Sequence, residues 1–342
     1  MIQSAVGKLV EKIDLTFDEA RESVADIFSG TVPASQVAGF LVALRMKGET
    51  VDEIAGAADA MRGAATRIHL PNAPVISDTC GTGGDKQGSF NISTAAAFVV
   101  AGAGFTVAKH GNRSISSQCG SADVLEVLGV KLDPPAAVVE RCLNDIGIGF
   151  LFAPAFHPAM KHAMPVRREL GVRTVFNLLG PLTNPAGANA QVIGVFSDKM
   201  VDVIAQVLVR LGTRHSMVVH GAGHDEITLF GNTRVVDIVD GRLRRKVITP
   251  ADFGFKRHSA SALRGGDKDE NAGIIRRIFA GEPGPQRDAV VANAAAAILV
   301  ASRAAGHRDV KTLKQARLIA EHAIDSCAAK DKLEKLVVMS QG

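Results

Sequence analysis

The sequence predicts an α/β protein that carries a small all-helical unit at its N-terminus. Residues 1–67 show helical patterns without a strand pattern, and from Val75 onward short apolar strands alternate with helices. Such alternation is typical of a mostly parallel central sheet with helices on its faces. We predict a helical domain at 1–70, joined by helices from about 165–190, and an α/β domain at 71–342.

Four short helices are expected in the N-terminal unit. The first should bury a face with the i, i+3, i+4, i+7 spacing, formed by Val6, Leu9, Val10 and Ile13. The second and fourth begin at capping boxes, Thr16–Glu19 and Thr50–Glu53. The third should span Ala34–Lys47 and stop at Gly48.

The α/β part should contain five short strands that a parallel sheet can bring together. They are expected at 75–78, 105–108, 148–152, 191–196 and 216–220. Helices should lie between them, for example from about Thr94, at 122–128 and at 200–211. An antiparallel hairpin is expected over 233–247, and an Ala-rich helical tail from Gln286. Ligands of such sheets bind at the loops that follow the strands.

The composition excludes several classes of protein. A chain of 342 residues with 46% hydrophobic residues has enough apolar material for a large core, which excludes general disorder. With no Trp or Tyr, binding of single-stranded nucleic acid by base stacking is disfavoured. The four cysteines contain no C-x-x-C pair, so we expect neither a zinc clip nor a disulfide framework. Since no signal-peptide or bilayer-spanning pattern is found, we expect a cytoplasmic protein without a membrane partner.

The first candidate site is the glycine-rich loop at Cys80–Asp85. Its three glycines let the backbone approach a ligand and direct N–H groups toward it. Asn91–Thr94 then opens an apolar helix, whose N-terminus suits a phosphate. The loop is neither a Walker A motif nor a complete dinucleotide fingerprint, since Lys86 stands in place of the third glycine. A flexible loop with a serine cap would show the same residues, so both interpretations stay open.

A second candidate loop, Lys109–Ser117, should follow the strand at 105–108. It places two cations, three hydroxyls and an amide around one glycine, and nearly all of these side chains can donate to a phosphate. The alternative is a solvated basic loop.

Two further features fit the same kind of ligand. Asp225–Glu226 follows the strand at 216–220, and adjacent loop carboxylates suit Mg²⁺, although such pairs are also common at turns. His220 and His224 are separated by glycines, so we reject a zinc site of the HExxH kind. Arg167 or Arg168 is suited to a carboxylate ligand, or lies on a solvated helix surface.

Taken together, these segments resemble the anthranilate phosphoribosyltransferase family. The resemblance rests, in chain order, on 81–85, 91–94, 109–117, Ser121–Glu126, Arg173–Pro185, Asp225–Glu226 and the helix at Asn293–Ala294. It implies a nucleoside phosphorylase-like α/β fold with an N-terminal helical domain. It also implies a Mg²⁺-dependent homodimer that transfers the phosphoribosyl group of phosphoribosyl pyrophosphate to the amine of anthranilate. The pathway is tryptophan biosynthesis, and pyrophosphate is released.

The resemblance also implies roles for individual residues. Those expected to bind phosphoribosyl pyrophosphate are Gly81, Gly84, Asp85, Ser89, Asn91, Ile92, Ser93, Thr94, Lys109, His110, Gly111, Asn112, Arg113, Ser114, Ile115, Ser116, Ser117 and Ser121. Those expected to bind anthranilate are Gly81, Asn112 and Arg167, and Ser93, Asp225 and Glu226 are expected to serve Mg²⁺. We expect no indispensable general base, because an aromatic amine is already neutral near pH 7.

Two other functions could use some of the same residues. A nucleoside phosphorylase-like enzyme with another acceptor is disfavoured by Arg167 and by the segment 173–185. A nucleic-acid binder could use the basic run 241–246, but a solvated hairpin edge explains that run better, and such a binder has no use for Asp225–Glu226. The chain departs from the family pattern at Cys119, where a small hydroxyl residue is more usual, and at His224, where an apolar residue is expected.

Overall fold

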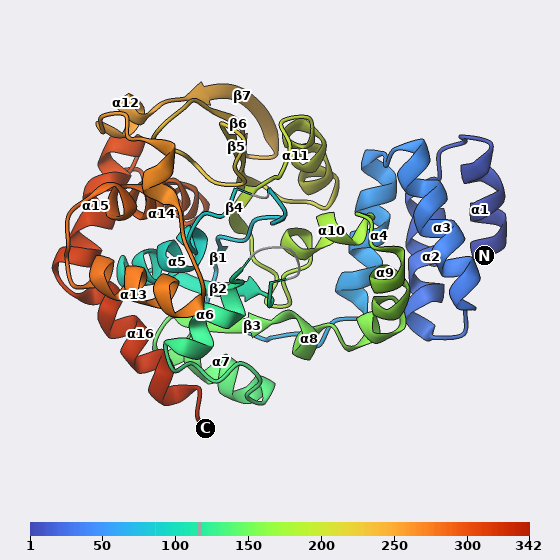
Figure 1. Ribbon diagram of the computed structural model, residues 1–342, viewed down its shortest axis with the longest axis horizontal. Coiled ribbons are helices and arrows are strands. Elements are labelled where there is room, and N and C mark those ends of the chain that lie inside the picture. Colours follow the sequence, from blue (N-terminus) through green and yellow to red (C-terminus); the bar gives the residue numbers. More distant parts are fainter. Residues whose placement is uncertain (86, 115–117) are drawn as a thin grey trace.

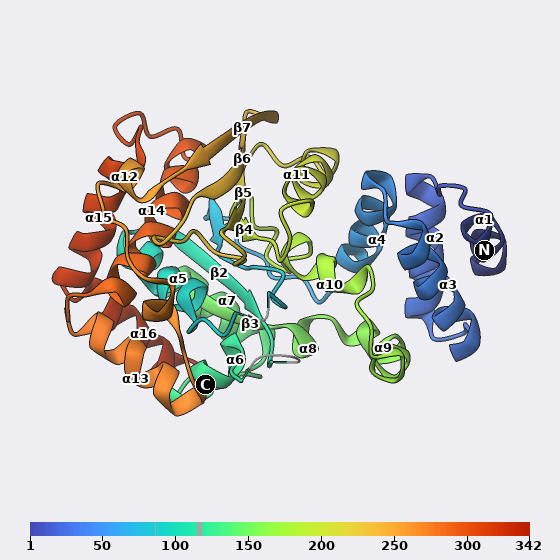
Figure 2. The same cartoon turned by 45° about the horizontal axis from the view of Figure 1, so that its top comes forward.

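The structure is a computed structural model that describes residues 1–85, 87–114 and 118–342. Figures 1 and 2 show a helical part, α1–α4, standing beside a larger α/β part. The helices are α1 (Ile2–Val10), α2 (Phe17–Ser29), α3 (Ala34–Lys47), α4 (Val51–Gly63), α5 (Ile92–Gly102), α6 (Ser121–Val127), α7 (Ala136–Asp145), α8 (Ala153–Phe156), α9 (Met164–Leu170), α10 (Phe176–Leu179), α11 (Met200–Arg210), α12 (Pro250–Phe253), α13 (Lys268–Phe279), α14 (Pro285–Ala304), α15 (Leu313–Asp325) and α16 (Ala328–Met339). Short 3₁₀ helices are η1 (Pro158–His162), η2 (Gly180–Leu182) and η3 (Ala260–Leu263). In the part of the chain that the structure describes, no helix has the length and apolar character to cross a membrane.

The central sheet has the mostly parallel arrangement that the sequence predicts. Its strands are β1 (Ile76–Asp78), β2 (Thr106–Gly111), β3 (Ile148–Phe152), β4 (Ala190–Gly194), β5 (His215–Gly221), β6 (Thr233–Val239) and β7 (Arg242–Ile248). They lie in the order β3-β2-β1-β4-β5-β6-β7, and of these strands only the β5–β6 and β6–β7 pairs are antiparallel. The α/β class with an N-terminal helical bundle is therefore confirmed.

The predicted hairpin forms the edge of this sheet. Asp240 and Gly241 connect β6 to β7 with φ of 51° and 74°, as a tight two-residue turn requires. The basic run 241–246 thus lies along an edge strand, where Lys246 bonds the carboxylate of Asp237 at 2.9 Å. This placement agrees with a charged, solvated sheet edge.

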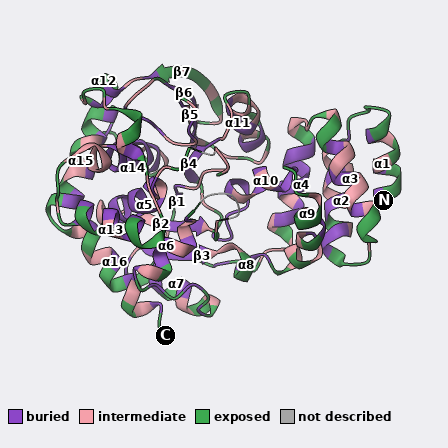
Figure 3. Cartoon of the chain, in the orientation of Figure 1, coloured by how far each residue is buried: buried purple, intermediate pink, exposed green. Residues whose placement is uncertain are grey.

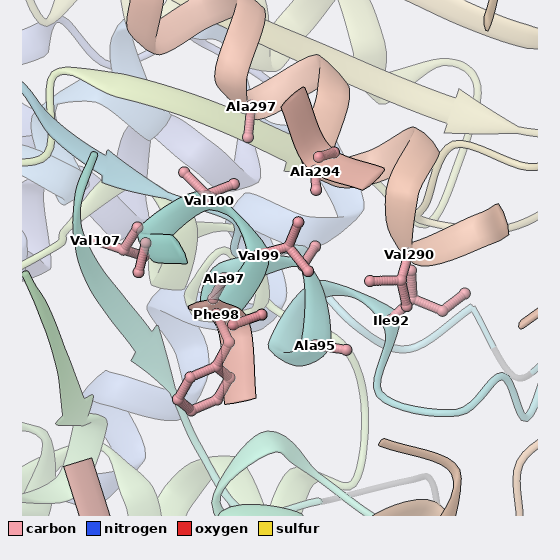
Figure 4. Packing of buried hydrophobic residues seen from close by; sticks show 14 of the residues in the cluster. Ile92, Ala95, Ala97, Phe98, Val99, Val100, Val107, Val290, Ala294 and Ala297 are labelled. Carbon is pink, nitrogen blue, oxygen red and sulfur yellow. The ribbon is translucent and has the colours of Figure 1, made fainter. Parts of the chain in front are cut away.

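Alternate residues of the middle strands serve two different cores. One face packs on α5 and α14 through Val192, Met217, Val219 and Val235. Figure 4 shows this core where Val99 of α5 lies near Ala294 of α14. The other face packs on α11 through Ile193, Val218, Val236 and Ile238, and this cluster continues into the helical part. Figure 3 shows the buried residues gathered in the strands and on the inward helix faces.

The helical part confirms most of its predicted elements and corrects one. Both capping boxes form, and α3 has the predicted bounds. The first helix, however, ends at Val10, because Lys12 adopts a positive φ and turns the chain. The predicted buried face is correct only in part. Leu9 is buried and Val6 packs on the same core, but Val10 and Ile13 are 61% and 52% exposed, and α1 buries Ile2 and Ala5 instead.

The helical part is joined to the sheet through segments that are distant in sequence. Helix α9 packs on α3, and α10 and α11 pack on α4. The half-buried Arg62 guanidinium of α4 donates to the carbonyl of Leu182 at 2.7 Å. This junction fixes α9 and α10 against the helical part.

Candidate active site

The predicted site segments meet at the carboxyl ends of four parallel strands. The glycine-rich loop follows β1, the segment from Asn112 follows β2, and shorter connections follow β4 and β5. Neighbouring parallel strands end at the same edge, which brings segments far apart in sequence into contact.

The glycine-rich loop is anchored to the end of β4. The Thr82 N–H donates to the carbonyl of Gly194 at 2.8 Å, and the Thr82 hydroxyl accepts from the Phe196 N–H at 3.0 Å. Gly83 and Gly84 have φ of 64° and 78°, so glycine suits both positions. These contacts fix the shape of the loop against β4.

The acidic pair packs directly against this loop. The Asp225 carboxylate accepts from the Gly83 N–H at 2.7 Å, and the Glu226 carboxylate accepts from the Ser93 N–H at 3.2 Å. A Cβ at Gly194 would lie 1.5 Å from the Asp225 carbonyl oxygen, and a Cβ at Gly81 would lie 2.7 Å from its carboxylate. Glycine at 81 and 194 is thus needed for this close approach.

Burial changes the acidity of the pair. Burial first, and then the nearby Asp85 carboxylate, raises the pKa of Asp225 to about 7. Burial and the Asp225 charge raise the pKa of Glu226 well above its ordinary value. Carboxylates held together against their own repulsion create a site at which a cation would be stabilised.

The donor set fits Mg²⁺ better than a metal enclosed by protein. Among the described residues, no group of three His, Cys, Asp or Glu side chains could hold a metal ion. Mg²⁺ needs only one or two carboxylates, because water and substrate phosphates complete its coordination. The His224 ring packs edge-to-face on Phe230, and His220 Nδ1 lies 2.7 Å from the Val195 carbonyl oxygen, in keeping with the rejected zinc site.

The predicted loop at 109–117 begins later than expected. Strand β2 continues to Gly111, which pairs with Phe152 of β3, so Lys109 and His110 are strand residues. The buried Lys109 ammonium donates to the carbonyl oxygens of Thr79 and His110 at 3.1 and 3.2 Å. Its charge lies beneath the glycine-rich loop and lowers the pKa of the nearby Glu226 carboxyl against the larger effect of burial.

His110 lies in a buried pair of histidines. Its Nδ1 is 2.9 Å from the Gly180 carbonyl oxygen, and its ring centroid is 5.1 Å from that of His157. Burial, followed by the His157 charge, lowers the pKa of His110 to about 3, and burial lowers that of His157 to about 4. Both imidazoles are therefore neutral near pH 7.

The remainder of the second loop is closed by hydrogen bonds at its base. The Asn112 N–H donates to the Ser121 hydroxyl at 3.2 Å, and the Ser114 N–H donates to Asp123 at 3.0 Å. Arg113 forms ion pairs with Asp123 and Glu126, at 3.0 and 2.8 Å. Its charge is thus directed toward α6. The predicted residues Ile115, Ser116 and Ser117 lie outside the described residues.

The other predicted residues lie at or just before the N-terminus of α5, a region around Asn91–Thr94 that we call the α5 entrance. Ile92 and Thr94 have buried side chains, and the Thr94 hydroxyl has no hydrogen-bond partner among the described residues. Ser89 forms an isolated antiparallel bridge with Arg264. Asp85 accepts from the Asp225 N–H at 3.4 Å, a long contact, which places its carboxylate at the acidic pair.

Arg167 lies in α9 with a half-buried side chain. Its guanidinium stands over the Phe176 ring at 5.4 Å, its Nη1 contacts Met164 Sδ at 3.5 Å, and desolvation lowers its pKa. The described residues form no ion pair with it within 4.0 Å, whereas the neighbouring Arg168 is exposed. A half-buried cation beside an aromatic ring is suited to a small organic carboxylate.

Sequence reasoning missed a network of amides around Asn91. Asn271 of α13 donates to the Asn91 side-chain oxygen at 3.0 Å, and the Cys119 thiol donates to the same oxygen at 3.3 Å. Asn271 also accepts from the Gly266 N–H at 2.9 Å. A polar residue on the buried face of α13 was the available signal, but its partner lies 180 positions away. Cys119 thus acts as a hydrogen-bonding group, which a hydroxyl could also provide.

Cys80 is not placed to act as a nucleophile. Burial, followed by the Asp78 charge, raises the pKa of its thiol to about 12. The thiolate is the reactive form of cysteine, so this thiol is inert near neutral pH.

Comparisons with known proteins identify the class to which this fold and site belong. Residues 3–65 match the helical bundle domain of the glycosyl transferase family, and residues 73–330 match its α/β domain. The chain is 53% identical over 337 residues to a protein named anthranilate phosphoribosyltransferase from Anaeromyxobacter sp. (strain K), with 98% of each chain covered. It is 49% identical over 343 residues to one of the same name from Methanocorpusculum labreanum, covering 100% of this chain and 99% of the other.

Solved structures agree with these relatives. The crystal structure of anthranilate phosphoribosyltransferase from Thermus thermophilus is similar with a TM-score of 0.92 and 45% identity, and covers 99% of each chain. The enzyme from Saccharomyces cerevisiae in complex with phosphoribosyl pyrophosphate and Mg has a TM-score of 0.89 at 29% identity, covering 99% and 98%. The fold is thus that of a glycosyltransferase with both of its domains. Within that class, the chain belongs to the anthranilate phosphoribosyltransferase family.

Proposed function

We infer that the chain carries out the reaction of its family. It transfers the phosphoribosyl group of 5-phosphoribosyl 1-pyrophosphate to the amine of anthranilate. The products are N-(5-phosphoribosyl)anthranilate and pyrophosphate, in tryptophan biosynthesis. The observation that carries this inference is an acidic pair bonded to the glycine-rich loop and to the start of α5, in a chain whose full-length relatives bear this name.

Mg²⁺ is the cofactor, and we propose that Ser93, Asp225 and Glu226 hold it. The yeast relative binds Mg together with phosphoribosyl pyrophosphate. Bound Mg²⁺ supplies positive charge that stabilises the departing pyrophosphate. The adjacent carboxylates of this chain support the assignment, because a bound cation would offset the desolvation and the mutual repulsion that raise their pKa values.

Phosphoribosyl pyrophosphate would lie on the glycine-rich loop and the α5 entrance. Backbone N–H groups of this loop, with the side chains of Asn91 and Ser93, are suited to phosphate and ribose oxygens. The buried Lys109 charge and the donors at Asn112 and Ser114 border the same region. The residues predicted from the sequence for this substrate remain our proposal for its binding site.

Anthranilate would be held by its carboxylate. We assign that carboxylate to Arg167, whose guanidinium already lies in a largely apolar setting beside Phe176. Asn112 and Gly81 are proposed to face the same substrate from the sheet edge. Holding the amine in line with the ribose carbon supplies much of the catalysis.

The reaction does not require a strong base in this proposal. The aromatic amine is neutral near pH 7, and the barrier lies in the departing pyrophosphate and the charge that grows on the sugar. The two buried histidines remain neutral, so they do not add positive charge beside that sugar.

The test uses the fluorescence of anthranilate. Purified protein is mixed with anthranilate, phosphoribosyl pyrophosphate and MgCl₂, and the signal is followed with and without EDTA. A loss of fluorescence that needs every component supports the reaction and its metal. If no loss occurs at high enzyme concentration, a different acceptor is indicated and the assignment of the substrate is wrong.

We also propose that the protein is a homodimer through its helical part. Val10, Ile13 and Met46 are 61%, 52% and 82% exposed, although all three are apolar. Val10 and Met46 lie on α1 and α3, which pack on each other, and exposed apolar side chains on adjacent helices are typical of an interface. Light scattering after size exclusion should give twice the chain mass of 35.8 kDa, and Met46→Glu should give the monomer. A wild-type monomer would contradict this proposal.

The domain division and the location in the cell are also part of this proposal. We propose a helical domain of residues 1–70 joined by helices from 165–190, since α9 and α10 pack on α3 and α4. The rest, 71–342, would be the catalytic domain. A cytoplasmic location fits a biosynthetic enzyme, and cell fractionation tests it.

A further inference from the structure

The side-chain amide of Asn293 binds both backbone groups of a single residue in the acidic loop. Asn293 lies on α14 and is buried. Its oxygen accepts from the Ile227 N–H at 3.0 Å, and its nitrogen donates to the Ile227 carbonyl at 2.9 Å. Ile227 directly follows Glu226. The contact has the hydrogen-bond pattern of one residue pair in a β-sheet, but a side-chain amide takes the place of the second strand.

The acidic segment, whose residues are all described, has no helix or strand of its own at this point. It leaves β5 at Gly221, turns through a backbone pair between Gly221 and His224, and re-enters a strand only at Thr233. The carboxylates of Asp225 and Glu226 accept from the N–H groups of Gly83 and Ser93, so these contacts depend on where the irregular backbone of the segment lies. Contacts from neighbouring elements are therefore needed to hold this backbone in place.

Asn293 holds it from the helix side. Gly194 of β4 is in close contact with the Asp225 carbonyl. Asn293 of α14 binds Ile227, two residues further along the chain. Asn293 lines the same small cavity, of about 10 Å³, as Ser93, Asp225 and Glu226. That space suits roughly one water-sized particle, so a small displacement of the segment changes it.

We propose that Asn293 is a positioning residue for the metal-binding pair. By fixing the Ile227 peptide, it orients the Asp225 and Glu226 side chains toward the glycine-rich loop and the α5 entrance. The inference rests on the proposed metal role of that pair. Asn293 also donates to the Ala289 carbonyl within its own helix at 3.0 Å, but its two bonds to Ile227 connect different elements.

A purely structural role can be separated from positioning by matched variants. Asn293→Ala removes the whole contact, and the nearly isosteric Asn293→Asp keeps an acceptor for the Ile227 N–H while it loses the donor. Ser302→Ala is the control, because Ser302 lies in the same helix, is fully buried and has a hydroxyl without a partner in the described part of the chain.

Two measurements are made on each full-length variant. Hydrogen–deuterium exchange of the protein without substrates and metal follows the segment around Ile227. Steady-state rates are then measured against MgCl₂ at saturating anthranilate and phosphoribosyl pyrophosphate. For Asn293→Ala we expect exchange at Ile227 and the half-saturating Mg²⁺ concentration each to rise about tenfold, with kcat largely recovered at high Mg²⁺. Asn293→Asp should be intermediate, and Ser302→Ala should match the wild type.

Several results would overturn the proposal. One is an Ile227 exchange rate in Asn293→Ala equal to that of the wild type. Another is a fall in kcat at all Mg²⁺ concentrations with an unchanged Mg²⁺ dependence. If Asn293→Ala does not fold, Asn293→Asp decides by the same criteria. If the wild type itself shows no Mg²⁺ dependence, the metal assignment fails, and the exchange data still decide whether Asn293 holds the segment.

Discussion

The Asp225 carboxylate accepts a hydrogen bond of 2.7 Å from the backbone N–H of Gly83, which precedes it by 142 positions. This contact joins the two halves of the candidate site, since Gly83 belongs to the loop that we propose for phosphate binding and Asp225 to the pair that we propose for Mg²⁺. The Asp225 carboxylate thus accepts from an N–H group of the loop that we propose for phosphate binding. We therefore expect binding of Mg²⁺ at the pair and of substrate at the loop to be linked.

Replacing Asp225 should change how stability depends on pH. The native pKa is raised from 3.8 to about 7, so the folded protein keeps this proton to a higher pH than the unfolded chain does. The stabilisation is complete below about pH 4 and is lost as the pH rises through about 7. In Asp225→Asn this loss disappears, and the melting temperature in EDTA should fall by several degrees less between pH 5 and 8 than in the wild type.

The control for that experiment is Asp309→Asn, which changes an exposed carboxylate in the connection between α14 and α15. Its pH profile should follow the wild type. Parallel profiles for the wild type and Asp225→Asn would mean that the Asp225 proton is not retained in the folded protein.

Replacing Arg167 should weaken one substrate selectively. Arg167→Ala should raise KM for anthranilate about 30- to 100-fold, because a charged hydrogen bond of about 2–3 kcal/mol is lost, and should leave KM for phosphoribosyl pyrophosphate within about twofold. Arg168→Ala, at the exposed neighbouring position, is the control. Steady-state kinetics with each substrate varied in turn decides; equal changes in both KM values would contradict the assignment.

The amide network should affect the other substrate. Asn271→Ala removes a donor to Asn91, so KM for phosphoribosyl pyrophosphate should rise about fivefold to tenfold, as for a hydrogen bond of about 1 kcal/mol. Cys119→Ser, which keeps a donor, should behave like the wild type. The effects of Asn91→Ala and Asn271→Ala should not add in the double variant, since the residues are in contact. Full additivity would show that Asn271 does not act through Asn91.

Two capping boxes with the same sequence pattern should differ in their effect on stability. Glu53 is fully buried and accepts from the Leu15 N–H, the Thr50 N–H and Lys47, whereas Glu19 is about 29% exposed. Glu53→Ala should lower the free energy of unfolding by about 3 kcal/mol, because it leaves the Leu15 and Thr50 N–H groups without their acceptor and removes one of the two carboxylates paired with Lys47. Glu19→Ala should cost about 1 kcal/mol or less. Chemical denaturation compares them, and equal losses would refute the distinction.

Local patterns predicted the elements well because their causes are local. The capping boxes, the glycine stops and the strand–helix alternation depend on residues a few positions apart. The buried face of α1 was predicted only in part, because two overlapping apolar patterns fit the same stretch. The choice between them depended on where the helix ends and Lys12 turns the chain. The sequence did not show that Lys109 belongs to β2 and not to the following loop. Pairing with a neighbouring strand does not change the spacing of apolar and polar residues along the chain.

The sequence by itself determined the fold class and the chemistry of the loops, since hydrophobic period and residue type are properties of short segments. Only the tertiary structure decided which groups meet. Gly83 reaches Asp225, Asn293 holds Ile227, and Asn271 contacts Asn91 because parallel strands end at one edge and α13 and α14 cover it. Such contacts depend on strand order and helix packing, which sequence spacing does not record.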